Sequence, residues 1–389
     1  MILSKYDFYI IIIFLFLTFG ILGGAFQPIR IISIILFLYY SPLIINNLKQ
    51  NKSQFYFVSF LGIYSFFSIF LYIENIKESF ISFIYILINL IFYSVFITFY
   101  KESNLKFKSI VIGVYVFLTI SLSYSIYEIT TGNHLSTNLD HGIESLMNRS
   151  YSSFSFGNYN TYVMILIMML PILIYSIINY NIKNKIYSLI LFFLASYVII
   201  INGSRTGAVL LLLTLGLFLL NRSKNFVYGL ISKIVVLGLG FSLLIQNMNV
   251  FDTLFLRLSN SGFESAGRVE NLTLPINGLI SNVFLGFGIG NYQFYMLENY
   301  PNKLILAPHN FFGEIFYELG LFGLILILYN LYSSTVLAIK RNDKFIFFTF
   351  LLIFPFFCMI NSGYLMGVYV WLYLAIMTSV AYFGVKDVR

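Results

Sequence analysis

One histidine at the end of a long polar segment is the side chain best suited to proton transfer in this sequence. His309 is one of only three histidines and lies in Ala307-Pro308-His309-Asn310, directly before an apolar run. A near-neutral imidazole accepts a proton from a hydroxyl group, so His309 is a candidate general base. The alternative is an interfacial histidine with locally satisfied hydrogen bonds. His134 and His141 have no matching partners, and we expect both to be solvated loop residues.

Two arginines have surroundings suited to binding an anion. Arg205 lies between two apolar runs in Asn202-Gly203-Ser204-Arg205-Thr206-Gly207. Its planar guanidinium can hold a phosphate bidentately, and backbone amides at the start of the next helix can approach the same anion. An interface anchor is the alternative. Arg268 poses the same choice, with a salt bridge to Glu264 or Glu270 as its alternative.

Two carboxylates follow His309 at helical spacing. Glu314 and Glu318 are separated by four residues and therefore share one face of the predicted helix. Carboxylates just inside an apolar run usually face the protein interior or a wet cavity. Together with Asn310, they are candidate supporting residues for His309 or for the arginines.

A glycine run precedes His309 in the same polar segment. Gly286-Phe287-Gly288-Ile289-Gly290-Asn291 superficially matches part of a dinucleotide fingerprint, but no predicted strand or βαβ unit precedes it. A tight bend that brings the backbone close to a ligand or to another helix is the favoured interpretation. Metal-site spacings, serine-hydrolase signatures and P-loop signatures are absent from the sequence.

The elements that must position these residues are membrane helices. Hydrophobic residues make up 59% of the chain and charged residues only 10%, so lipid must be the solvent for much of its surface. Runs of about 20 apolar residues are long enough to cross a bilayer as helices. Twelve spans are predicted, at 8–26, 28–46, 55–73, 80–99, 108–128, 159–180, 186–202, 207–220, 226–246, 311–338, 345–361 and 364–385. The first run lacks a convincing cleavage site, so we expect it to be a retained helix.

The charges between these spans predict an orientation. Connections on one side carry fifteen Lys and Arg residues and those on the other side only seven. The positive-inside bias therefore predicts that both termini are cytoplasmic. We interpret the net charge of +8 as this topology signal and not as a nucleic-acid footprint. The lone Cys358 lies in an apolar run and is expected to be a packing residue.

The sequence predicts a single integral membrane domain over 1–389 with two long outer loops. The first outer loop spans 129–158, and the large outer loop, 247–310, carries most of the candidate residues. Within the latter, 271–281 and 290–300 look partly helical and amphipathic. No internal repeat is evident, which weakens a transporter interpretation.

Taken in order, these motifs resemble one enzyme superfamily. The sequence resembles the O-antigen ligase and Wzy-type polysaccharide polymerase superfamily over roughly 150–340. The motifs that carry the resemblance are Ser204-Arg205-Thr206-Gly207, Gly267-Arg268, Gly286–Asn291, Pro308-His309-Asn310 and Glu318–Gly323. Arg149 and Gly157–Thr161 also resemble that family, although Tyr159 replaces a proline often found there.

The resemblance implies a GT-C-like glycosyltransferase that uses a sugar chain on undecaprenyl pyrophosphate and needs no cofactor, nucleotide sugar or metal. It implies that His309 deprotonates the acceptor hydroxyl, while Arg205 and Arg268 hold the pyrophosphate and Arg149 is a weaker candidate. The implied setting is a bacterial cytoplasmic membrane with membrane lipid around the enzyme. A flippase and a chain-length regulator are the implied partners, with no nucleic acid.

Three functions follow from this resemblance and from the composition. The first is a polymerase that joins lipid-linked oligosaccharide repeats into a capsular or O-antigen-like surface polysaccharide. The second is a ligase that moves finished polymer onto a final acceptor. A transporter or flippase would instead need charged residues in several spans and broken helices, and the sequence favours it less.

Overall fold

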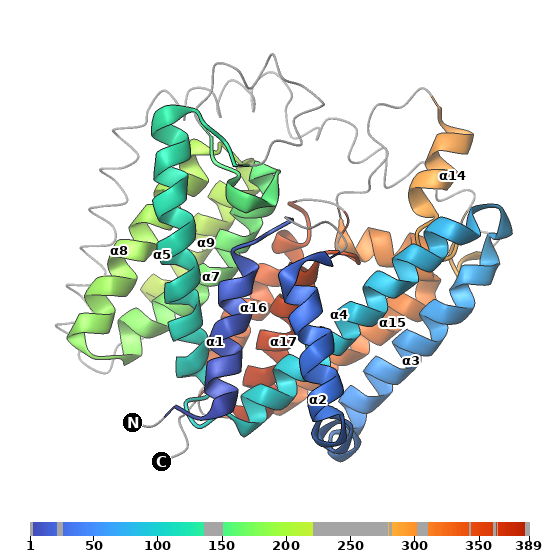
Figure 1. Ribbon diagram of the computed structural model, residues 1–389, viewed down its shortest axis with the longest axis horizontal. Helices are drawn as coiled ribbons and strands as arrows, with labels where there is room; N and C mark the ends of the chain where they lie inside the picture. Colours follow the sequence, from blue (N-terminus) through green and yellow to red (C-terminus); the bar gives the residue numbers. More distant parts are fainter. Residues whose placement is uncertain are drawn as a thin grey trace.

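The computed structural model describes residues 3–21, 26–135, 151–220, 279, 282–301, 310–341, 344–360, 363 and 365–385. Within these ranges all regular structure is helical. The helices form a bundle in which both termini lie at one end (Figure 1). We call this the terminus end and the opposite one the loop end.

The helices from α1 to α9 alternate in direction between the two ends (Figure 1). The helices are α1 (Lys5–Leu17), α2 (Pro28–Gln50), α3 (Lys52–Ser68), α4 (Ile76–Glu102), α5 (Phe107–Thr131), α7 (Tyr159–Asn179), α8 (Ile182–Ile201), α9 (Arg205–Leu220), α14 (Tyr292–Asn299), α15 (Phe311–Ile339), α16 (Lys344–Phe357) and α17 (Val368–Phe383). Short 3-10 turns occupy Ile69–Leu71 (η2), Ile73–Asn75 (η3) and Phe154–Phe156 (η4).

Seven of the described helices are long and apolar enough to cross a membrane. They are Pro28–Gln50, Lys52–Leu71, Ile73–Glu102, Phe107–Thr131, Tyr159–Asn179, Ile182–Ile201 and Phe311–Ile339, and α9, α16 and α17 are apolar but shorter. Each predicted span overlaps a described helix, apart from 226–246, which lies outside the described residues. The all-α polytopic membrane class is therefore confirmed, while twelve spans and a GT-C-like arrangement stay predictions.

The end of the first helix differs from its predicted boundary. The predicted span reaches residue 26, but α1 ends at Leu17, and the chain turns through Gly20 at φ +53°. Ser155 causes this early end, because its hydroxyl donates to the carbonyl of Thr18 (2.6 Å) and its carbonyl accepts from Ile21 (3.0 Å). Residues 154–156 thus cap α1 at the loop end.

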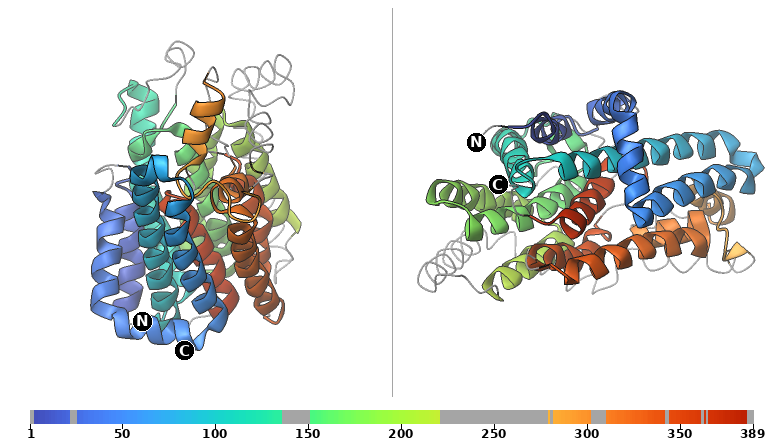
Figure 2. Two further views of the ribbon diagram at one scale, coloured as in Figure 1. Left: turned by 90° about the vertical axis from the view of Figure 1, so that its right-hand side faces the viewer. Right: turned by 90° about the horizontal axis from the view of Figure 1, so that it is seen from below.

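Two helices form the interior of the bundle. Helix α7 packs against α8, α9 and α16. Of the residues in an apolar 18-residue stretch of α7, 89% are buried. Helix α17 packs against α4 and α15 and lies near the middle of the bundle when it is seen from below (Figure 2). Both helices are apolar around their full circumference, as expected for helices without a solvent face. Cys358, just beyond α16, is completely buried in the core, which confirms that it is a packing residue.

The two ends of the bundle differ in charge. The connections at the terminus end carry mostly basic residues, namely Lys49, Lys52, Lys101, Lys106, Lys108, Lys183, Lys185, Lys340 and Arg341. The described loop end carries mostly acidic ones, namely Glu74, Glu78, Glu128, Glu298, Glu314 and Glu318. The division predicted from the sequence is therefore a physical division between the two ends of the molecule.

A buried polar network joins four helices inside the bundle. The Tyr93 hydroxyl on α4 lies within hydrogen-bond distance of Gln54 Oε1 (2.5 Å), Asn330 Oδ1 (3.1 Å) and Thr378 Oγ1 (3.1 Å). Gln54 Nε2 also donates to Asn330 Oδ1 (3.1 Å). Because these groups have no water to replace lost partners, the network fixes α3, α4, α15 and α17 against one another.

This network gives the first prediction. Tyr93→Phe removes the shared hydroxyl, and we expect it to destabilise the protein by on the order of 1 kcal/mol. Thermal unfolding in detergent would show a lower midpoint. Tyr39→Phe is the matched control, because Tyr39 is 77% exposed, and its midpoint should not move. Equal midpoints for the two variants would show that the network contributes nothing measurable.

Candidate functional site

The predicted site residues divide into two groups. His309, Arg268 and Arg149 lie outside the described residues. Arg205 is described through its backbone, as the first residue of α9, and Asn310, Glu314 and Glu318 are described in full at the start of α15. The structure therefore describes the framework around the predicted site.

Asn310 fixes the point at which the large outer loop becomes a membrane helix. It is the N-cap of α15, and its Oδ1 accepts a hydrogen bond from the backbone N–H of Gly313 (3.0 Å). The next N–H, that of Phe311, donates to the carbonyl of Cys358 just beyond α16 (3.0 Å). The start of α15, which follows His309 in the sequence, is therefore anchored on the residue just beyond α16.

The two predicted supporting carboxylates hold loops at the loop end. Glu314 and Glu318 are 5% and 7% exposed. Glu314 Oε1 accepts from the backbone N–H of Leu365 (3.1 Å), between α16 and α17. Glu318 Oε2 accepts from the N–H of Gly290 (2.9 Å), and its carboxylate also accepts from the N–H of Tyr292. Hydrogen bonds from backbone N–H groups offset part of the cost of burying these two acidic side chains.

Helix α15 is interrupted where the glycine segment, residues 286–291, meets it. The sequence predicted an unbroken span over 311–338, but Gly320 adopts φ +61° and ψ −165°. The break leaves backbone N–H groups of α15 without partners inside the helix. Residues 283–284, just before the glycine segment, accept from them: the N–H groups of Leu321 and Phe322 donate to the carbonyls of Val283 (2.8 Å) and Phe284 (3.3 Å). A backbone break at membrane depth requires such partners.

Close backbone contact explains the glycines on both sides of this junction. A Cβ on Gly286 would lie 2.5 Å from the backbone nitrogen of Gly320, and a Cβ on Gly288 would lie 2.6 Å from the carbonyl oxygen of Ser68. Both glycines also have positive φ, at +73° and +86°. The predicted tight bend is confirmed, and the partner is another helix.

The glycine segment and α14 also bind the hairpin between α3 and α4. Asn291 Oδ1 accepts from Asn75 Nδ2 (2.8 Å) and from the Ser79 hydroxyl (3.2 Å). Beyond it, the Tyr72 hydroxyl donates to Glu298 Oε2 (2.5 Å) on α14, and this hydrogen bond, with desolvation, raises the pKa of Tyr72 to about 12. The predicted helical character of 290–300 is confirmed by α14.

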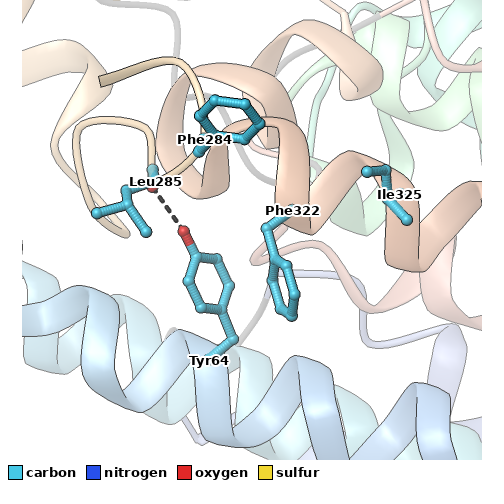
Figure 3. A pocket seen from close by; sticks show the side chains of 5 residues that line it. All are labelled: Tyr64, Phe284, Leu285, Phe322 and Ile325. Carbon is cyan, nitrogen blue, oxygen red and sulfur yellow. Dashed lines mark hydrogen bonds between the residues drawn. The ribbon is translucent and has the colours of Figure 1, made fainter. Parts of the chain in front are cut away.

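An apolar pocket of about 280 Å³ lies below this junction, between α3 and α15 (Figure 3). It is lined by Tyr64, Phe284, Leu285, Phe322 and Ile325. Its one hydroxyl, on Tyr64, donates to the carbonyl of Leu285 (2.8 Å), so the remaining lining is suited to hydrocarbon. Ile325 is 52% exposed, which leaves the pocket open at the surface of membrane helices.

The hairpin that carries Arg205 is built around small residues. Gly203 has φ +58°, and Ser204 caps α9, its Oγ accepting from the N–H of Gly207 (3.2 Å). A Cβ on Gly207 would lie 2.6 Å from a methyl carbon of Val163, so α9 packs closely against α7. Arg205 therefore starts a helix at the loop end, where the positive end of the helix dipole favours an anion.

Sequence reasoning missed a further buried acidic residue at the loop end, Glu128, at the end of α5. It is completely buried and accepts hydrogen bonds from residues 152–154. The expectation that His134 is solvated is wrong: its side chain is 12% exposed, it stacks on Tyr151 (centroids 4.1 Å apart), and its Nδ1 lies 3.6 Å from Glu128 Oε1. The sequence signal that could have indicated this burial is the position of Glu128 at the end of the predicted span 108–128.

Helix α16 connects the two parts of the candidate site. It packs against α9, which begins at Arg205, and Cys358 just beyond it binds the start of α15, which follows His309. Within the described ranges, no group of three or more His, Cys, Asp or Glu could hold a metal ion. The described framework thus offers a helix start bearing an arginine and buried carboxylates that hold loops.

The fold and this loop-end arrangement define a polytopic membrane protein whose candidate chemistry lies at one end of a helical bundle. Residues 190–328 match the protein family described as O-antigen ligase, which is consistent with the resemblance to the O-antigen ligase and Wzy-type polymerase superfamily. The matched range contains Arg205, Arg268 and His309. No curated protein matches the chain.

The glycine segment gives the second prediction. Gly290→Ala would place a Cβ against the Ser82 hydroxyl at φ +76°, so we expect the segment to be displaced and the thermal midpoint to fall. Gly132→Ala is the matched control, because φ is +72° there but no atom lies within 4 Å. The control should lose only the stability of about 1–2 kcal/mol that a left-handed backbone conformation costs a residue with a Cβ. Equal losses would show that close packing of Gly290 is unimportant.

Proposed function

We propose that this chain joins undecaprenyl-pyrophosphate-linked oligosaccharide repeats into a surface polysaccharide. The observation that carries the proposal is the order of Ser204-Arg205, Gly267-Arg268 and Pro308-His309-Asn310 inside the range that matches the O-antigen ligase family. The starts of α9 and α15 lie at the same end of the bundle, which supports a common site.

The proposed reaction is a single glycosyl transfer. The oxygen of an acceptor sugar hydroxyl attacks the anomeric carbon of the donor chain, and the bond from that carbon to the pyrophosphate oxygen breaks. His309 takes the hydroxyl proton, while undecaprenyl pyrophosphate leaves with the bonding electron pair. A general base contributes about 10²- to 10⁴-fold to such a rate.

The arginines would act on the leaving group. Negative charge develops on the pyrophosphate as the bond breaks, and fixed cations around it lower the barrier electrostatically. Arg205 and Arg268 are the proposed cations, with Arg149 as a weaker third. The positive end of the α9 helix dipole would add partial positive charge beside Arg205. Arginine thus supplies the positive charge in this proposal, without a metal ion.

The orientation of the bundle follows from its charges. The excess of Lys and Arg at the terminus end favours a cytoplasmic position for that end. The loop end, with Arg205 and Asn310, would then face outward in a bacterial cytoplasmic membrane. A flippase would deliver the lipid-linked repeat to this face, and a separate protein would regulate chain length.

A ligase is the second candidate, because the matching family is described as O-antigen ligase. Its donor would be the same class of lipid pyrophosphate, and the same base and cations would serve. The difference lies in the acceptor, which would be a final carrier in place of another lipid-linked chain.

His309 gives the third prediction. His309→Ala should lower glycosyl transfer by at least about 10²-fold, because the acceptor hydroxyl loses its base. The rate would be measured with purified protein and a defined undecaprenyl-pyrophosphate oligosaccharide. His141→Ala is the control for histidine loss in an outer loop, and protein level should be equal for both variants. Full-length product from His309→Ala would remove this residue from the catalytic role.

The fourth prediction separates polymerase from ligase. In a strain that lacks the protein, a lost polymerase should leave only single repeats on the lipid carrier or on the final acceptor. A lost ligase should leave long chains that remain on the lipid carrier. Gel separation of the lipid-linked fraction measures both, and long lipid-linked chains would overturn the polymerase proposal in favour of the ligase.

A further inference from the structure

We propose that Glu128 and Asn202 are positioning residues for the glycosyl transfer. They hold Ser152 between the end of α5 and the hairpin that starts α9 with Arg205. We call Glu128, Ser152 and Asn202 the loop clamp. The inference rests on the proposed function, because it assigns a role to groups next to the proposed pyrophosphate site.

The Glu128 carboxylate is the centre of the loop clamp. Its Oε2 accepts from the Ser152 hydroxyl (2.5 Å) and from the backbone N–H groups of Ser153 (3.1 Å) and Phe154 (2.9 Å). Its Oε1 accepts from the N–H of Leu135 (3.2 Å). A fully buried carboxylate is costly unless such donors surround it, so residues 152–154 and Glu128 stabilise one another's positions.

Asn202 holds the same residue from the opposite side. Its Oδ1 accepts from the N–H of Ser152 (2.8 Å), and its Nδ2 donates to the carbonyl of Ser152 (2.9 Å). Both polar atoms of this completely buried amide are thus used on one residue. Asn202 is the C-cap of α8 and precedes Arg205 by three residues.

This arrangement determines the direction of the hairpin. In the chain, Asn202 and Ser204 are separated only by Gly203, which has positive φ. A glycine restricts the backbone little, so the chain alone does not fix the direction of the hairpin. The bonds from Asn202 to Ser152 therefore help to hold the start of α9 relative to the end of α5. In the sequence, Ser152 also follows Arg149 by three residues. A displacement of about 1 Å at a binding group can lower a rate by about 10²-fold.

A purely structural role is the alternative, and Ser125 provides the matched control. Ser125 is buried on α5, one turn before Glu128, and its hydroxyl donates to the Tyr162 hydroxyl on α7 (2.8 Å). It has no hydrogen bond to residues 151–154 or to the hairpin among the described contacts. Ser125→Ala therefore removes a buried hydrogen bond from the same helix without touching the loop clamp.

The test compares Asn202→Ala, Glu128→Gln, Ser152→Ala and Ser125→Ala as purified full-length proteins. Initial rates are measured against donor concentration and against acceptor concentration, together with inhibition by inorganic pyrophosphate. We expect Asn202→Ala and Glu128→Gln to lower kcat/KM for the donor by about 10²-fold. The donor KM and the pyrophosphate inhibition constant should rise, whereas the acceptor KM should stay unchanged. Ser125→Ala should match the unmodified protein in all four quantities.

Ser152→Ala keeps the proposal testable if the larger changes prevent folding. It removes only the hydroxyl bond to Glu128 and leaves both bonds to Asn202, so the donor KM should rise by roughly tenfold. The positioning role is overturned if the clamp variants behave like Ser125→Ala. It is also overturned if they lower kcat at an unchanged donor KM, since that indicates a smaller folded fraction.

Arg205→Ala and His309→Ala distinguish this failure from failure of the proposed function. If both lose activity while the clamp variants keep the donor KM, only the positioning role is wrong. If both keep full activity, the proposed site itself is wrong, and the positioning role is overturned with it.

Discussion

The structure depends on one constraint: backbone polar groups at the edge of a bilayer must find partners within the protein. This constraint is most evident at Gly320, where α15 breaks and the N–H groups of Leu321 and Phe322 bind the carbonyls of residues 283 and 284. The large outer loop is therefore joined to a membrane helix through main-chain hydrogen bonds. Asn310, which caps the start of the same helix, is part of this hydrogen-bonded arrangement between loop and helix.

Buried carboxylates meet this constraint at two separate places. Glu318 accepts from backbone N–H groups of the glycine segment and α14, and Glu128 does so for residues 152–154. In both cases loop amides donate to a buried acidic side chain from a membrane helix.

The sequence was sufficient to predict the helical membrane class, most span positions, the helix after residue 290 and the bend at the glycines. These features follow from apolar run length, from glycine content and from charge placement. It did not predict the break at Gly320 or the early end of α1 at Leu17, because each depends on a partner distant in the chain. His134 was mistaken for a solvated residue for the same reason: burial by Tyr151 and Glu128 arises only after folding. The roles of His309, Arg205, Arg268 and Arg149 stay predictions.

The break at Gly320 also has a consequence for biogenesis. Val283 and Phe284 are synthesised before α15, but they can bind Leu321 and Phe322 only after that helix has emerged and entered the bilayer. An interrupted helix is costly in lipid while its N–H groups lack partners, so a continuous helix is the favoured form for α15 during insertion. The interruption is stabilised only when the carbonyls of residues 283 and 284 are in place. The hydrogen bonds that complete the loop end therefore require α15 to be in place first.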